Sequence, residues 1–371
     1  MIAKRLSYDR LLCSVSLLLA FIGVVMVYSA SAIKAQEKYD DPFLFLKKQL
    51  IWVLIGLAVM VWAMYCDYRI FQQYAPLLFL LSLFLLLLVL IPSVGVKVNG
   101  ARRWLRLFGV SFQPSELAKI AMVLLLARFF ARSADRGEQF TRGFLPPLIL
   151  SGLVFGLVVL QPNFGTAAVL LCAAMSLCFV AGVRLRHMGI AMTAVVPLAF
   201  LIVQIHPYAN TRVLTLLDPL HASSKAGYQI HQSLYALGPG GLLGRGLGDS
   251  VQKLFYLPES HTEFIFAIVG EEMGFVGALL VISLFGLLLW RGTRIALRAP
   301  DLFGAYTAMG ITFTIVAQAA INLGVVVGLL PTTGVPLPFV SLGGSSMVTT
   351  FLCIGILLSI SRYQTARGRL A

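Results

Sequence analysis

The stretch APLLFLLSLFLLLLVLIP (75–92) contains no charged residue. A helix rises about 1.5 Å per residue and the hydrocarbon core of a bilayer is about 30 Å thick, so about 20 such residues cross it. The whole chain has the same character: 59% of its 371 residues are hydrophobic, 12% are charged, and the mean hydropathy is +0.89. A soluble domain usually has roughly 45–50% apolar and about 25% charged residues. The sequence therefore predicts a membrane-embedded protein.

Similar runs recur along the chain and predict an all-α polytopic membrane protein, with a single domain over 1–371. The ten expected transmembrane helices cover about 11–31, 48–66, 75–92, 113–131, 145–161, 164–182, 189–206, 263–289, 303–329 and 344–361. Only QPNF (161–164) separates the fifth helix from the sixth, so we expect a tight turn there.

Orientation follows from the Lys and Arg residues, which concentrate in cytoplasmic segments. With both termini in the cytoplasm, the inner segments carry 16 Lys and Arg residues and the outer segments carry 12. We therefore expect cytoplasmic termini and one large extracytoplasmic loop, about 207–262, between helices 7 and 8. The net charge of +14 comes from short segments between apolar runs and not from a basic patch, so nucleic-acid binding is not predicted.

Two other outer segments have unusual sequences. Residues 98–119, VNGARRWLRLFGVSFQPSELAK, contain an Asn-Gly turn signal and predict a small hairpin. The Pro and Gly residues of 329–346 cannot continue a helix and predict a re-entrant segment. The glycine cluster LGPGGLLGRGLG (237–248) lacks a P-loop ending, which leaves either a tightly turning segment or close approach of the backbone to a lipid headgroup.

Glu116 and Lys119 lie inside an expected span, where charges are costly and usually paired. Their spacing of three places them on one helix face. They either form a buried ion pair that holds helices together or line an outward-facing polar cavity.

The stretch LPESHTEFIFAIVGEE (257–272) holds four of the fifteen acidic residues beside one of five histidines. We expect a helix that begins near Thr262, with Thr262 as N-cap and Glu263 in the first turn. Glu263 is then a capping carboxylate, stabilised by the helix dipole, or a general base at the outer membrane surface. Glu271 and Glu272 are expected to make polar contacts between helices.

Several cations are expected on the outer side, against the usual trend: Arg102, Arg103, Arg106, Arg212, Arg245 and Lys253. Anionic lipid headgroups or a diphosphate would balance the positive charge of these residues, because arginine binds phosphate in a bidentate manner. His261 with Glu259 or Glu263 could ligate a metal ion, although a His-x-Glu pattern alone is a weak signal.

A set of motifs occurs in a fixed order along the expected spans: NGARRW (99–104), FQPSELAK (112–119), QPNFGTA (161–167), LLDP (216–219), GYQIHQSLYALGPGGLLGRGLG (227–248), QKLFYLPESHTEFIFA (252–267) and GLLPTTGVPLPFVSLGGSS (328–346). In these motifs the chain resembles the SEDS family (shape, elongation, division and sporulation) over nearly its whole length. QKLFYLPE and the segment 322–339 are more similar to the division and sporulation members than to the elongation member.

The resemblance implies a glycosyltransferase that polymerises lipid II on the outer face of the bacterial cytoplasmic (inner) membrane, at the division septum. It implies a class B penicillin-binding protein and other division-complex proteins as partners, and Mg²⁺ or Mn²⁺ as cofactor. Glu263 stands at the position of the family's catalytic acid, where it would take a proton from the acceptor hydroxyl. The expected substrate-binding residues are Arg102, Arg103, Arg212, Glu116, Lys119, Gln161, His261 and Ser345.

The chain departs from the family's motifs at several positions. The family usually has Asp at the positions of Glu263 and Asn163, and Pro239 and Leu342 replace other usual residues. Two alternative functions remain open at this point. A lipid II flippase would fit the many spans and intramembrane charges, and a scaffold would mainly recruit the penicillin-binding protein.

Overall fold

The computed structural model describes residues 8–98, 101–107, 109–132, 139–205, 207–217, 225–254 and 256–367. Its longer helices are α1 (Arg10–Tyr39), α2 (Leu44–Tyr65), α3 (Tyr68–Leu90), α4 (Pro114–Arg132), α5 (Leu145–Leu160), α6 (Phe164–Val180), α7 (Leu185–Ile205), α10 (Ile265–Leu297), α11 (Leu302–Val326) and α12 (Gly344–Arg367). Shorter elements are η2 (Phe140–Phe144), α8 (Pro207–Leu217), α9 (Lys225–Leu237), η3 (Gly238–Gly240), β1 (Gly95–Val98), β2 (Ala101–Leu107) and β3 (Val110–Phe112).

A helix occupies each of the ten ranges expected from the sequence. Seven helical segments of the described chain are long and apolar enough to cross a membrane, and α6 is a shorter apolar helix. These seven are α1, α2, α3, η2 with α5, α10, α11 and α12. The fold is therefore mostly helical and suited to a membrane, as predicted.

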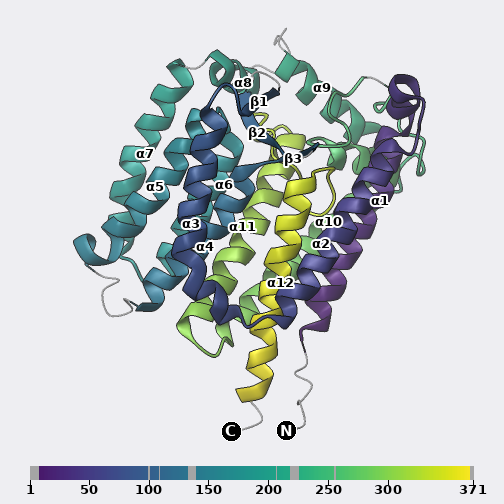
Figure 1. The fold of residues 1–371 in the computed structure, drawn as a ribbon. Helices are drawn as coiled ribbons and strands as arrows, with labels where there is room; N and C mark the ends of the chain where they lie inside the picture. Colours follow the sequence, from purple (N-terminus) through teal and green to yellow (C-terminus); the bar gives the residue numbers. More distant parts are fainter. Residues whose placement is uncertain are drawn as a thin grey trace.

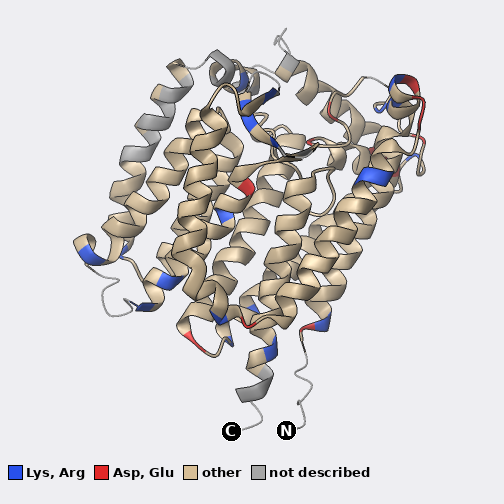
Figure 2. Ribbon diagram, viewed as in Figure 1, with Lys and Arg blue, Asp and Glu red and all other residues tan. Residues whose placement is uncertain are grey.

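The helices run side by side, with α11 and α12 inside the bundle and α2 and α3 at its periphery (Figure 1). Charged residues gather mainly at the two ends, and the region between them is largely uncharged (Figure 2). Helix α1 begins and α12 ends at the same end of the bundle, while the strands, α8 and α9 cover the opposite end. This second end, here called the sheet end, carries the candidate site.

The predicted hairpin is confirmed and extended by a third strand. Strand β2 pairs antiparallel with both β1 and β3. The Asn99-Gly100 turn lies outside the described residues. The expected turn between the fifth and sixth helices is also confirmed, because α5 ends at Leu160 and α6 begins at Phe164.

The segment between α11 and α12 is irregular, as its Pro and Gly residues predicted. It enters the bundle: Leu337, Phe339 and Val340 are buried, and a Cβ atom at Gly23 of α1 would lie 2.3 Å from the Phe339 carbonyl oxygen. This backbone approach fixes the segment against a helix that is distant in sequence.

The expected start of α10 is wrong. The helix begins at Ile265, and its N-cap residue, Phe264, makes no side-chain cap. Residues 259–264 form a turn instead, because the Glu259 carbonyl accepts hydrogen bonds from the backbone N–H groups of Thr262 and Phe264 at 3.1 and 3.3 Å. The Thr262 hydroxyl donates to the carbonyl and carboxylate of Glu259, at 3.2 and 3.0 Å. Glu263 consequently lies in a turn before the helix and not in its first turn.

Candidate active site

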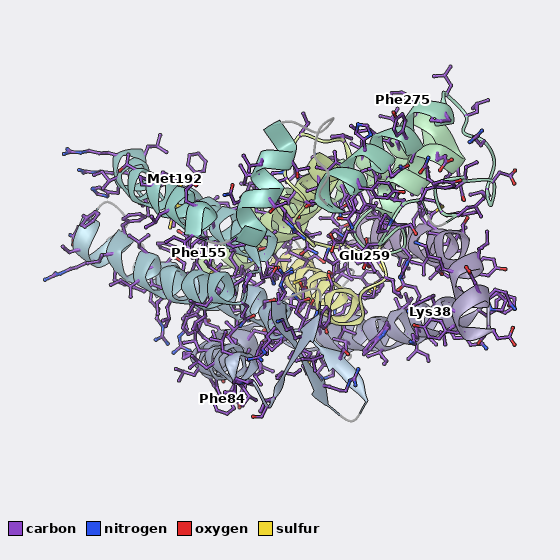
Figure 3. The ribbon with its side chains drawn as sticks, turned by 90° about the horizontal axis from the view of Figure 1, so that it is seen from above. Lys38, Phe84, Phe155, Met192, Glu259 and Phe275 are labelled. Carbon is purple, nitrogen blue, oxygen red and sulfur yellow. The ribbon has the colours of Figure 1, made fainter. Side chains whose placement is uncertain are left out.

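A cavity of about 200 Å³ lies at the sheet end, next to the turn that precedes α10. Its lining comes from β2, α8, α12, the residue before α4 and the two irregular segments before α10 and α12: Arg103, Trp104, Gln113, Arg212, Glu259, Thr262, Glu263, Gly334, Pro336, Leu342, Gly343 and Ser346. Seen from the sheet end, Glu259 lies near the centre of the molecule, whereas Phe84 lies at its periphery (Figure 3). The cavity thus lies over the middle of the bundle.

Glu263 and Arg103 meet at Gly334. The backbone N–H of Gly334 hydrogen-bonds to the Glu263 carboxylate. A Cβ atom at Gly334 would lie 3.2 Å from Oε1 of Glu263 and 3.4 Å from Nη1 of Arg103, and the φ of +79° also favours glycine. Asn322 fixes the neighbouring backbone, since its Nδ2 donates to the carbonyls of Glu263 and Val335, both at 2.8 Å.

The two cavity arginines are held by backbone carbonyls, which carry no net charge. Arg103 donates from Nε to the carbonyl of Gln161 at 3.2 Å, and it also donates to the carbonyl of Pro162. Arg212 donates from Nη1 to the carbonyl of Thr332 at 2.5 Å. These contacts place both guanidiniums at the cavity wall, where they can offset negative charge on a ligand.

The pKa of Glu263 is raised above the ordinary carboxyl value. Burial is the largest cause, and the nearby Glu259 carboxylate acts in the same direction. Arg212, Arg103 and the Gly334 N–H favour the carboxylate and partly oppose this rise. A base whose pKa approaches the working pH is well matched to proton transfer, so these surroundings suit Glu263 to general-base chemistry.

Arg102 does not share this cavity. The pairing of β1 with β2 is irregular here: Trp104 pairs with Val96 and Arg102 pairs with Lys97, which leaves Arg103 as the extra residue of a bulge. Arg102 and Gln161 line a separate cavity. The structure therefore assigns Arg102 no place beside Glu263 and leaves Arg103 and Arg212 as the cavity arginines.

Glu116 and Lys119 form the predicted ion pair, with 2.9 Å between Oε1 and Nζ. Both are buried, and they do not line the cavity. Thr349 donates to Glu116 at 3.1 Å, Lys119 donates to Gln318, and Gln318 donates to the hydroxyl of Ser346 at 3.3 Å. The pair joins α4, α11 and α12 and reaches the cavity wall only through Gln318 and Ser346.

His261 and Ser345 lie behind the cavity wall. The His261 ring packs against Phe45, with 4.8 Å between the centroids. Burial lowers the pKa of His261 to about 4, so the ring is neutral at pH 7. Ser345 accepts a hydrogen bond from the backbone N–H of Gln113 at 3.0 Å, which ties the start of α12 to the start of α4.

Asn163, at a position where the family usually has Asp, is buried and donates to the hydroxyl of Ser115 at 3.4 Å. Because Lys119 is paired with Glu116 in this chain, its charge is balanced without an aspartate at position 163.

Sequence reasoning missed six residues of the cavity lining: Trp104, Gln113, Gly334, Pro336, Gly343 and Ser346. All six belong to the quoted motifs, which is the signal that could have found them. Gly334 is the most informative, because a glycine between Thr-Thr and Val-Pro indicates a backbone conformation that other residues rarely adopt.

Within the described ranges, no group of three His, Cys, Asp or Glu side chains is placed to hold a metal ion. Two carboxylates, Glu259 and Glu263, do line the cavity. Mg²⁺ commonly takes one or two protein carboxylates when substrate phosphates supply further ligands. The donor set therefore fits a cation only if it binds together with a diphosphate.

Taken together, the fold and cavity define a multi-pass membrane protein with a carboxylate and two arginines at one end of its helical bundle. Residues 9–366 match the FtsW/RodA/SpoVE family of cell cycle proteins, and the chain belongs to this family. It is 46% identical to stage V sporulation protein E of Bacillus subtilis over 368 residues, which cover 98% of this chain and all of that protein. It is 42% identical to the probable peptidoglycan glycosyltransferase FtsW of Geobacter sp. strain M18 over 355 residues, with 95% and 96% of the two chains covered.

Solved structures show the same fold. A chain from a peptidoglycan synthase complex that coordinates polymerization and crosslinking is 31% identical, with a TM-score of 0.80 and coverage of 97% and 99%. The rod shape determining protein RodA of Thermus thermophilus is 30% identical, with a TM-score of 0.72 and coverage of 97% and 98%. The predicted SEDS resemblance is thereby confirmed.

Proposed function

We propose that this protein is a peptidoglycan glycosyltransferase that polymerises lipid II on the outer face of the bacterial cytoplasmic membrane during septal wall synthesis. The observation that carries the proposal is the close approach of both Glu263 and Arg103 to Gly334, beside Arg212, in one cavity at the sheet end. A base beside cations is what transfer of a sugar from a lipid diphosphate requires. The names of the FtsW relatives support the same activity.

In the proposed reaction, the Glu263 carboxylate takes the proton from the 4-hydroxyl of the acceptor's N-acetylglucosamine. That oxygen forms a bond to the anomeric carbon of the donor while the bond from this carbon to the lipid diphosphate breaks, which inverts the configuration. The electron pair leaves with the diphosphate, whose growing charge Arg103 and Arg212 offset. Gly334 keeps the carboxylate and the Arg103 guanidinium close enough to act on the same substrate.

We also propose that a divalent cation, Mg²⁺ or Mn²⁺, binds with the substrate. Glu259 is the protein carboxylate available for it, because Glu263 is assigned to proton transfer, and diphosphate oxygens would complete the coordination. The cation would add positive charge at the leaving group. The roles of Arg103, Arg212 and Glu263 do not depend on it.

The topology and partners follow from the same proposal. All ten long helices would cross the bilayer, with both termini in the cytoplasm and the sheet end outside, at the division septum. A class B penicillin-binding protein would bind beside the bundle and crosslink the strands, as the similar synthase complex suggests, and other division proteins would join it. Arg102 would act from the second cavity. The other residues expected to bind substrate lie behind the wall of the Glu263 cavity and would position the residues that touch the substrate: Glu116, Lys119, Gln161, His261 and Ser345.

The test is polymer formation from lipid II by the chain purified with its penicillin-binding protein. Wild type should make glycan polymer, Glu263→Gln should make none because an amide cannot accept the proton, and Glu263→Asp should retain activity. Glu37→Gln makes the same change at an exposed residue of α1 that does not line the cavity, and it serves as the matched control for folding and partner binding. Polymer from Glu263→Gln would remove Glu263 as the base. An inactive wild-type complex that moves lipid II across vesicle membranes would instead indicate a flippase.

A further inference from the structure

A second cavity, of about 290 Å³, lies next to the sheet. It is lined by Leu90, Lys97, Ala101, Arg102, Leu160, Gln161 and Pro162. The turn between α5 and α6 separates it from the Glu263 cavity. Within this turn, the backbone carbonyl of Gln161 accepts a hydrogen bond from Nε of Arg103 at 3.2 Å.

The position of this second cavity fits the headgroup level of a bilayer. Leu90 and Leu160 are the last residues of α3 and α5, which belong to two of the candidate membrane spans. Apolar side chains around these helix ends are exposed: Leu87 to 51%, Ile91 to 46% and Leu160 to 63%. Lipid chains would cover them, so a cavity directly above lies where headgroups begin.

Two cations face each other at the mouth of this cavity. Lys97 of β1 and Arg102 of β2 are direct cross-strand partners in the sheet. Like charges in such a position repel and destabilise the pairing. Across the described part of the chain, neither has a carboxylate within 4 Å. An anion between them would turn this repulsion into two favourable contacts.

Gln161 fixes the inner wall of the cavity. The residue is 1% exposed, and its Nε2 donates to the Leu86 carbonyl at 3.0 Å. This hydrogen bond ties the turn between α5 and α6 to α3, so the wall behind the two cations is held in place.

We propose that this cavity binds the phosphate headgroup of an anionic lipid. Lys97 and Arg102 bind the phosphate oxygens, and the chains lie along α3 and α5. A phospholipid and a polyprenyl diphosphate both offer this phosphate. For the polyprenyl diphosphate the inference rests on the proposed function, in which Arg102 acts from this cavity, but binding itself requires neither Glu263 nor a second substrate.

Native mass spectrometry of the purified protein can test this with three probes: phosphatidylglycerol, phosphatidylcholine and undecaprenyl diphosphate. Wild type should retain at least one of the two anionic probes in preference to phosphatidylcholine. The double variant Lys97→Gln/Arg102→Gln should retain that probe about tenfold less, which corresponds to about 1.4 kcal/mol. Lys97→Arg/Arg102→Lys keeps both charges and should still bind it. Lys38→Gln/Lys48→Gln removes two exposed cations elsewhere and should behave as wild type.

The source of the phosphate follows from the same data. Retention of undecaprenyl diphosphate alone would assign the cavity to the carrier of a lipid-linked sugar, and retention of phosphatidylglycerol as well would assign it to the bulk lipid. Equal retention by wild type and Lys97→Gln/Arg102→Gln, or equal retention of phosphatidylcholine, would overturn the proposal. Glu263→Gln separates the two proposals, since it should abolish polymerisation and leave lipid binding unchanged.

Discussion

At the scale of single residues, the acidic side chains around the start of α10 have different tasks. Glu263 faces the cavity, whereas Glu271 accepts hydrogen bonds from the Ser250 hydroxyl at 2.5 Å and the Val251 N–H at 2.9 Å. Glu272 pairs with Lys253 at 2.9 Å. Both were expected to make polar contacts between helices. Glu272 does so, because Ser29 of α1 donates to it at 2.6 Å, whereas the partners of Glu271 lie in the loop before α10.

The pH dependence of the proposed reaction should report the surroundings of Glu263. Because only the carboxylate can accept a proton, the rate should fall as the pH falls through the raised pKa of Glu263. Arg212→Gln removes the strongest attraction that favours the carboxylate, so it should raise this pKa further and move the acidic limb of the profile to higher pH. Arg212→Lys keeps the charge and is the control. Initial polymerisation rates measure the profile, and an acidic limb that is identical in Arg212→Gln would contradict the assignment of the base.

Loss of the buried Lys253–Glu272 pair should destabilise the protein. Both side chains are at most 5% exposed, and Ser29 donates to Glu272 at 2.6 Å. Glu272→Gln leaves the Lys253 ammonium buried without its counter-charge, which should cost on the order of 3 kcal/mol. Lys47→Gln breaks the exposed pair with Asp41 and should cost less than about 1 kcal/mol. Thermal unfolding in detergent compares the two, and equal losses would show that Lys253 does not depend on Glu272.

At the scale of elements, the glycine cluster is explained by the helix that it covers. The peptide N–H groups of Arg245 and Gly246 donate to the carbonyls of Glu271 and Glu272, at 3.0 and 3.1 Å. The peptide N–H of Phe275 in turn donates to the carbonyl of Gly241 at 2.9 Å. Helix α10 is interrupted there, and backbone packs directly on backbone. The sequence left two interpretations of the glycine cluster, a tightly turning segment or close approach of the backbone to a lipid headgroup. The structure favours the tightly turning segment, which packs on α10.

The interruption of α10 requires glycine at position 274. Its φ of 66° and ψ of −162° are strained for other residues, and a Cβ atom would lie 2.3 Å from the Gly244 nitrogen. Gly274→Ala should lower the free energy of unfolding by about 1–3 kcal/mol for the backbone strain alone. Gly286→Ala, on the same helix, meets no atom within 4 Å and should be neutral or stabilising. Thermal unfolding midpoints measure both, and an unchanged midpoint for Gly274→Ala would exclude a fixed kink.

At the scale of the whole molecule, the sequence predicted the helices because each one is indicated by a single continuous run of about 20 apolar residues. It could not predict that Glu263, Gly334 and Arg103 meet, because they come from separate segments joined only by the packing of the bundle. The family motifs contain most of the residues that line the cavity, but they do not show how these residues are arranged in space. Arg102 was grouped with Arg103 because adjacency in sequence does not show which face of a strand a side chain occupies. The start of α10 was missed because the Glu259 carbonyl accepts hydrogen bonds from the backbone N–H groups of Thr262 and Phe264 and holds 259–264 in a turn, which the local sequence does not indicate.

The proposed topology makes one prediction about the molecule as a whole. One end carries the pairs Asp9–Arg291 and Arg69–Asp301, at 2.5 and 3.2 Å, and the other carries the cavity. A substrate whose sugars lie outside the cell requires the cavity end to face outward. With the five native cysteines replaced, Lys48→Cys at the sheet end should react with a membrane-impermeant maleimide in intact spheroplasts.

Arg298→Cys, just beyond the last residue of α10, should react with the maleimide only after permeabilisation. Phe84→Cys is the matched control: the side chain is 59% exposed in the middle of α3, so hydrocarbon should shield its thiol from the polar reagent before and after permeabilisation. Rapid labelling of Arg298→Cys in intact spheroplasts, with Lys48→Cys protected, would invert the topology. Glu263 would then face the cytoplasm, where it could not polymerise a substrate presented outside, and the proposed function would fail together with the orientation.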